Sequence, residues 1–449
     1  MKGPCAARID TVLHAIAARN SVVNAYTHVL AERARAEAGA LDARGTENLP
    51  GPLVGMPYAV KNLFDVAGLP TLAGSKINAG APPAAADAVL VQRLRAAGAV
   101  LTGTLNMDEY AYGFTTENDH YGPTRNPHDV ARSAGGSSGG SGAAVAAGLV
   151  PFTLGSDTNG SIRVPASLCG VYGLKPTYGR LPRSGTFPFV SSLDHLGPLA
   201  DCVTTLAAAY DAMQGPDEAD PACAGRPPEP VSPDLDHGID GLRIAVAGGY
   251  FSPETDSQAD RAVAQIGGAL GVQREILLPE AERARAAAYV ITAAEGAQLH
   301  LQRLRTRLAD FDQLTRPRLL AGSQVPAVWY VRAQRLRRWF HERAMALFRE
   351  VDVFIAPATP VSARPLGREH FLWRGKTLPL RPNLGMYTQP LSLIGLPVVV
   401  VPVDTGDGLP IGVQIVAPPW RENWCMRVAR HLEKAAACRA WITVTQGHV

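Results

Sequence analysis

Apolar residues recur at helical spacing through the first 40 residues of the chain. Ile9 and Leu13, for example, fall on one face of a helix. Asn20 and Ser21 interrupt the pattern, which predicts two helices within residues 6–40, the second with Ser21 as its N-cap. The same spacing predicts further helices at residues 87–97, 203–213, 256–270, 280–308, 325–349 and 420–436.

Short apolar runs bounded by turn-forming residues predict strands between these helices. They lie at residues 53–60, 99–103, 149–154, 242–247, 351–357, 396–403 and 412–416, the last two as a pair. Strands that alternate with helices are typical of an α/β fold with a mixed sheet. Residues 214–240 are rich in Pro, Asp and Glu and indicate a surface linker. We expect one domain over 1–449, with a catalytic lobe before this linker (1–213) and a second lobe after it (241–449).

Composition excludes several classes of function. The 449 residues carry 43 Lys and Arg against 40 Asp and Glu, which leaves a net charge of +3. No basic stripe is interleaved with aromatic residues, so we expect no direct nucleic-acid partner. The sequence shows neither a secretion signal nor an apolar stretch of membrane-spanning length, which favours a cytoplasmic protein without membrane contact. The six cysteines form no metal or redox pattern.

A turn of small residues supplies a candidate nucleophile. In the segment Thr158-Asn159-Gly160-Ser161, the glycine permits a backbone geometry in which several N–H groups point at one spot. Such N–H groups can stabilise the oxyanion of a tetrahedral intermediate, so we assign the oxyanion hole to Thr158, Asn159 and Gly160. The residues from Ile162 onward are expected to be helical, which places Ser161 at a helix N-terminus. Ser161 is the predicted nucleophile.

The predicted base is a lysine. Lys61 follows an apolar strand, and desolvation there should lower its pKa from the reference value of ~10.4. A neutral lysine can accept a proton directly or through another hydroxyl, for which Ser137 in the GGSSGG loop is the candidate. Taken alone, each of these signals is typical of a linker, a surface lysine or an ordinary turn. The histidines in this half of the chain fall in no triad motif and are expected to be structural: His120, His128 and His195.

The combination resembles the amidase signature family. The family pattern is matched by GGSSG at residues 135–139 and GSDTNGSIRVP at residues 155–165, with the family's spacing between the two serines. The likeness extends over nearly the whole chain. It implies a twisted mixed sheet flanked by helices on both faces, no metal, no cofactor, and a catalytic triad of Ser161, Ser137 after a cis peptide bond, and Lys61.

One departure from the family concerns the nucleophile turn. Many members carry Gly-Gly where this chain has Asn159-Gly160. The Asn159 side chain either orients the substrate or holds the turn. The N-terminus is also expected to lack the first helix of the relatives.

Within the family, the motifs most resemble subunits that hydrolyse 1-carboxybiuret in cyanuric acid degradation. Glutaminase subunits of tRNA-dependent amidotransferases come next. By that resemblance Arg337 would bind a substrate carboxylate, while the family's acidic residue for an ammonium group falls at Gly385. Tyr112 and Tyr387 are candidate pocket walls. This combination favours a small anionic amide over glutamine.

The resemblance also implies an oligomer that includes a small helical partner subunit. Ammonia release from a carboxybiuret-like substrate is the predicted reaction. The alternatives are a glutaminase subunit of an amidotransferase, a general small-amide amidase, and a catalytically silent scaffold.

Overall fold

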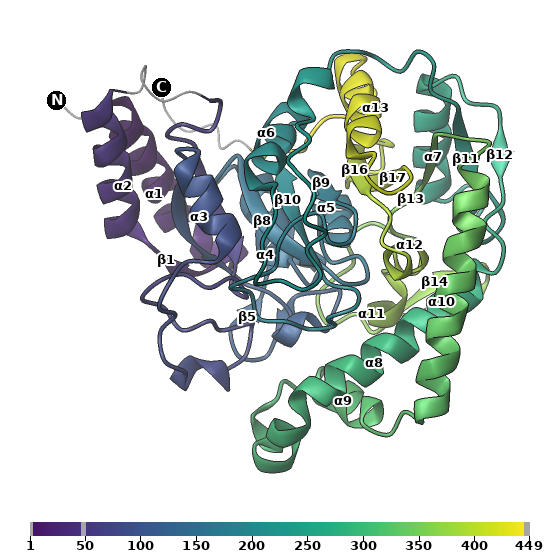
Figure 1. Cartoon of the computed structure of the whole chain (residues 1–449), viewed down its shortest axis with the longest axis horizontal. Coiled ribbons are helices and arrows are strands. Elements are labelled where there is room, and N and C mark those ends of the chain that lie inside the picture. The colour runs from purple at the N-terminus through teal and green to yellow at the C-terminus, as the bar shows by residue number, and fades with distance from the viewer. Residues whose placement is uncertain (1–2, 46–50, 444–449) are drawn as a thin grey trace.

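One long β-sheet runs through the molecule (Figure 1). The structure is a computed structural model that describes residues 3–45 and 51–443. Within them, the 11-stranded sheet has the spatial order β1 (Tyr26–Val29), β3 (Val100–Leu105), β2 (Pro57–Lys61), β8 (Phe152–Asp157), β10 (His195–Ala200), β9 (Tyr172–Lys175), β16 (Val398–Val403), β17 (Ile411–Val416), β13 (Val353–Pro357), β11 (Ile244–Ala247) and β12 (Glu275–Ile276). The sheet mixes parallel and antiparallel pairs, which confirms the predicted fold class.

The two lobes share this sheet. Strand β9 of the first lobe pairs antiparallel with β16 of the second, with Leu174 opposite Val399. The predicted pairing of the last two strands, β16 and β17, is confirmed. Backbone hydrogen bonds therefore continue across the boundary that the Pro-rich segment marks in the sequence.

Helices cover both faces of the sheet. The described helices are α1 (Pro4–Val23), α2 (Ala31–Arg44), α3 (Val89–Ala96), α4 (Gly139–Ala146), α5 (Arg163–Cys169), α6 (Val203–Met213), α7 (Gln258–Ala269), α8 (Ala281–Thr306), α9 (Arg316–Gly322), α10 (Ala327–Leu347), α11 (Leu380–Asn383), α12 (Gln389–Leu393) and α13 (Glu422–Lys434). Alternate residues of β2 belong to separate apolar clusters, Tyr58 and Val60 to one and Ala59 to the other. This alternation is the period of a strand whose two faces are both buried.

The predicted second helix near the N-terminus is wrong in its position. Ser21 lies inside α1, which ends at Val23, and the chain then forms β1 before α2 begins. Tyr26 pairs with Leu105 on β3, and the Tyr26 hydroxyl bonds the Thr102 hydroxyl at 3.0 Å. Pairing with a strand that is distant in the sequence thus overrides the local helical pattern.

The carboxyl ends of two neighbouring strands place polar side chains at one edge of the sheet. Strands β2 and β8 are parallel neighbours, with Val60 opposite Leu154, so their carboxyl ends meet at the same edge of the sheet. Lys61 ends β2 and Asp157 ends β8.

Helices α8, α9 and α10 form an arm that extends from the second lobe (Figure 1). No helix in the described part of the chain is both long and apolar enough to cross a bilayer.

Candidate active site

Lys61 lies at the centre of a small hydrogen-bonded group. The side chain is fully buried, and its Nζ donates to the Oγ of Ser137 at 2.6 Å and to the Oγ of Ser156 at 2.9 Å. Across residues 3–45 and 51–443, no carboxylate comes within ion-pair distance of this amine. Two hydroxyl groups are therefore the direct partners of a lysine that has no exposed surface.

This environment favours the neutral amine. Burial lowers the pKa of Lys61 from 10.5 to about 7, although the more distant charges of Asp108, Asp157 and Asp194 act in the opposite direction. Desolvation dominates because an ammonium ion without a direct counterion loses its hydration when buried. The amine can thus accept a proton near neutral pH.

Ser137 is held by the loop that precedes α4. The Gly136–Ser137 peptide bond is cis. The Ser137 carbonyl oxygen accepts the Asp108 N–H at 3.2 Å, and the Ser138 N–H donates to the Ser161 carbonyl oxygen at 3.2 Å. The loop therefore fastens Ser137 to Lys61 on one side and to the segment of Ser161 on the other.

The turn that carries Ser161 is organised around a buried carboxylate. Asp157 accepts the Gly160 N–H at 2.7 Å and the Ile162 N–H at 3.2 Å. Helix α5 begins at Arg163, as the sequence predicts for the residues after Ser161. Because the Gly160 N–H is already bonded to Asp157, it is not available to an oxyanion. The Thr158 and Asn159 N–H groups remain the proposed donors.

Arg163 completes this arrangement. Both Arg163 and Asp157 are fully buried, and the Arg163 Nε lies 2.9 Å from the Asp157 carboxylate. Burial works against the charged form, but the guanidinium holds the pKa of Asp157 below its usual range. Arg163 also donates to the Thr388 carbonyl oxygen at 3.1 Å and to the Gln414 Oε1 at 2.8 Å. The nucleophile turn is thereby tied to the second lobe.

A small cavity opens beside Ser161. Its volume is ≈ 20 Å³, and Ser161, Asn159, Tyr112 and Arg318 are among its lining residues. Ser161 itself is 3% exposed.

Only one of the three predicted substrate-binding residues lines this cavity. Tyr112 lines the cavity, but Arg337 and Tyr387 are not among its lining residues. Arg337 donates to the Ser192 carbonyl oxygen at 2.8 Å, and Tyr387 is a core residue whose ring packs near Phe251. The arginine that does line the cavity is Arg318, on helix α9.

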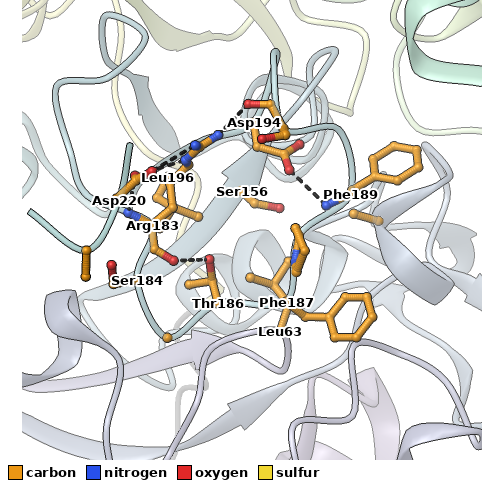
Figure 2. A pocket seen from close by; sticks show the side chains of 15 residues that line it. Leu63, Ser156, Arg183, Ser184, Thr186, Phe187, Phe189, Asp194, Leu196 and Asp220 are labelled. Atoms are coloured by element: carbon orange, nitrogen blue, oxygen red, sulfur yellow. Dashed lines mark hydrogen bonds and ion pairs between the residues drawn. The ribbon is translucent and has the colours of Figure 1, made fainter. Parts of the chain in front are cut away.

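A second cavity adjoins the first on the side of Lys61. Figure 2 shows it, with Ser156, Asp194 and Phe189 among its labelled lining residues. The cavity has a volume of ≈ 230 Å³, and Ala111 and Phe189 line both cavities. Since Ser156 also bonds the Lys61 amine, the second cavity reaches the direct partner of that amine.

Comparison with known proteins identifies the family of this chain. The family model named Amidase matches residues 7–426. The chain belongs to the amidase signature family. It is 58% identical over 434 residues to the 1-carboxybiuret hydrolase subunit named AtzE, from Pseudomonas sp. (strain ADP), covering 96% of this chain and 95% of that protein. The A subunit of the glutamyl-tRNA(Gln) amidotransferase from Roseiflexus sp. (strain RS-1) is 40% identical over 452 residues, covering 93% and 90%.

A solved structure is similar over nearly the whole fold. It is described as "An unexpected vestigial protein complex reveals the evolutionary origins of an s-triazine catabolic enzyme". Its TM-score is 0.95 at 56% identity, covering 97% of this chain and 96% of that one. The protein is therefore an amidase with the fold of its family.

Sequence reasoning missed two polar residues of this amidase site. Ser156 stands in the GSD motif beside the turn, and its position near the end of a buried strand was a usable signal. Arg318 lies on the short helix α9, within a region that the sequence pattern left unassigned. Nothing in the local sequence separates it from Arg316, so only tertiary structure reveals its place.

The buried amine predicts a distinctive pH dependence of stability. Between about pH 7 and 10.5 the unfolded chain binds a proton at Lys61 that the folded amidase does not bind, so this group makes folding more favourable as pH rises. We expect the free energy of unfolding of wild type, minus that of Lys61→Met, to rise by roughly 1 kcal/mol per pH unit over this range. Urea unfolding from pH 6.5 to 9.5 measures it.

Lys376→Met, at an exposed position of the hairpin strand β15 (Lys376–Pro379), is the control for loss of one positive charge. Parallel stability curves for wild type and Lys61→Met would contradict the prediction, because they would mean that Lys61 stays protonated in the folded protein.

Proposed function

We propose that this amidase hydrolyses the terminal amide of 1-carboxybiuret, a small carboxylated urea, and releases ammonia. Its similarity to the AtzE protein over nearly the whole chain supports this substrate. The observation that carries the mechanism is the fully buried Lys61 amine, bonded to the Ser137 hydroxyl at 2.6 Å. A lysine in that state can serve as a general base at neutral pH.

The proposed reaction begins with proton transfer from Ser161 to Ser137 and from Ser137 to the neutral Lys61 amine. The Ser161 oxygen attacks the amide carbon, and the N–H groups of Thr158 and Asn159 stabilise the resulting oxyanion. Lys61, through Ser137, then donates the proton to the departing nitrogen, so that ammonia leaves and an acyl-enzyme remains. Water activated by the same groups releases the acid and restores Ser161.

Glutamine is the second candidate substrate, because the A subunits of amidotransferases are also similar to this chain. Two observations speak against it. The position aligned with the family's acidic residue is Gly385, and a Cβ atom there would lie 2.4 Å from the Phe114 ring. Phe114 lines the cavity beside Ser161. An aromatic ring thus fills space that a carboxylate would need in order to bind the glutamine ammonium group.

We further propose that the amidase works in the cytoplasm, within an oligomer that contains a small partner subunit. The similar solved structure is described as a protein complex, which supports the partner.

Ser161→Ala tests the nucleophile. Ammonia release from 1-carboxybiuret should fall about 10⁴-fold or more, because a covalent route cannot proceed without the attacking hydroxyl. Ser232→Ala, on the exposed surface, is the control. A faster wild-type reaction with glutamine than with 1-carboxybiuret would overturn the substrate assignment. Full activity of Ser161→Ala would overturn the mechanism.

The pH dependence of the rate tests the base. Lys61 must be neutral to accept a proton, and its pKa is about 7. We therefore expect kcat/KM to rise about tenfold per pH unit below pH 7 and to level off above it. Initial rates of ammonia release between pH 5.5 and 9 provide the profile. A flat profile across that range would rule out Lys61 as the titrating base.

A further inference from the structure

The cavity beside Ser161 contains one guanidinium group, that of Arg318. The Arg318 guanidinium lies over the Tyr112 ring, with its Cζ 3.8 Å from the ring centroid. One guanidinium nitrogen donates to the Tyr112 carbonyl oxygen at 2.8 Å. In the described ranges, no carboxylate forms an ion pair with Arg318. The stack and the single bond fix the plane of the group while leaving other N–H donors for a ligand.

Asn159 supplies the opposite kind of group to the same cavity. Its Nδ2 donates to the Thr292 hydroxyl on α8 at 2.8 Å, which fixes the side chain. Its Oδ1 is buried and has no donor among the described residues, and the residue as a whole is 7% exposed. An unpaired buried acceptor is costly and rare in native proteins. A substrate N–H would satisfy it.

We propose that Arg318 and Asn159 together select the substrate. Arg318 binds the carboxylate at one end, and the Asn159 Oδ1 accepts an N–H of the ureido chain near the carbonyl that Ser161 attacks. This inference rests on the proposed function and names the residues that give the amidase its substrate specificity. It moves carboxylate recognition from Arg337, which is bonded to the Ser192 carbonyl oxygen, to Arg318.

The same pair explains why glutamine fits poorly. None of the residues that line this cavity is acidic, so the α-ammonium group of glutamine would find no counterion beside the Arg318 charge. Glutamine also has a methylene group where a carboxylated biuret has the N–H next to its terminal amide carbonyl. The Asn159 Oδ1 would then stay unpaired in the complex, a loss that binding sites use to reject near-isosteres.

Arg318→Met tests the carboxylate contact with two substrates, 1-carboxybiuret and biuret, which lacks the carboxylate. We expect kcat/KM for 1-carboxybiuret to fall about 10- to 100-fold, chiefly through KM, while kcat/KM for biuret changes less than about threefold. Arg316→Met removes the same charge from the same helix outside the cavity and should leave both substrates unaffected. Arg318→Lys should recover part of the loss, because it restores charge without the planar fork.

Asn159→Gly tests the acceptor by comparing 1-carboxybiuret with glutaramate, an amide acid of equal length that has methylene groups in place of the ureido N–H groups. The wild-type preference for 1-carboxybiuret should fall about tenfold. Thr292→Val is the matched control, because it removes the tether of Asn159 but keeps the acceptor. It should lower both rates together and leave their ratio unchanged.

The outcomes separate the inference from the proposed function. If wild type hydrolyses 1-carboxybiuret and Arg318→Met loses activity equally on both substrates, the function stands and the Arg318 assignment is overturned. An unchanged substrate ratio in Asn159→Gly overturns the assignment of Asn159, which then only holds the turn. If wild type acts on biuret or glutaramate but not on 1-carboxybiuret, the proposed function fails and this selection mechanism with it. Far-UV circular dichroism of each variant confirms that it has folded.

Discussion

The buried ion pair of Asp157 and Arg163 is the interaction on which the rest of this amidase depends. Neither side chain is exposed, so each has lost its hydration, and such a pair is stable only when its remaining donors and acceptors are also satisfied. Here they are: Asp157 accepts two N–H groups of the turn around Ser161, and Arg163 reaches Gln414 on β17. One pair thus sets the shape of the nucleophile turn and connects it to the second lobe.

Burial has the opposite consequence for Lys61. Arg163 is paired with a carboxylate, whereas the Lys61 amine at the same edge of the sheet hydrogen-bonds, among the described residues, only to two serine hydroxyls. Burial without a direct counterion lowers the pKa of Lys61 to about 7. The paired Arg163 stays charged and stabilises the fold, whereas the unpaired Lys61 can lose its proton and so take part in proton transfer. The two side chains differ because the fold brings a carboxylate within hydrogen-bonding distance of Arg163 and two hydroxyl groups within that distance of Lys61.

The proposed reacting groups and the arginine of the cavity come from different parts of the chain. Lys61, Ser137 and Ser161 all belong to the first lobe, where parallel strand ends and two loops fix them. Arg318 and Thr292, which shape the other side of the cavity, come from the helical arm of the second lobe. A family built this way can change substrate by altering the arm while the reacting groups stay in place.

The sequence by itself determined many of the local elements and predicted which groups would react. Apolar spacing predicted α6 over residues 203–213 to the residue, and motif spacing singled out Lys61 and Ser137, whose side chains are hydrogen-bonded at 2.6 Å. Only tertiary structure decided what depends on distant partners. The strand at Tyr26–Val29 exists because β3 offers an edge, and the Gly160 N–H is taken by Asp157. Arg318 rather than Arg337 reaches the cavity because helix packing, which local sequence does not encode, sets the direction of each side chain.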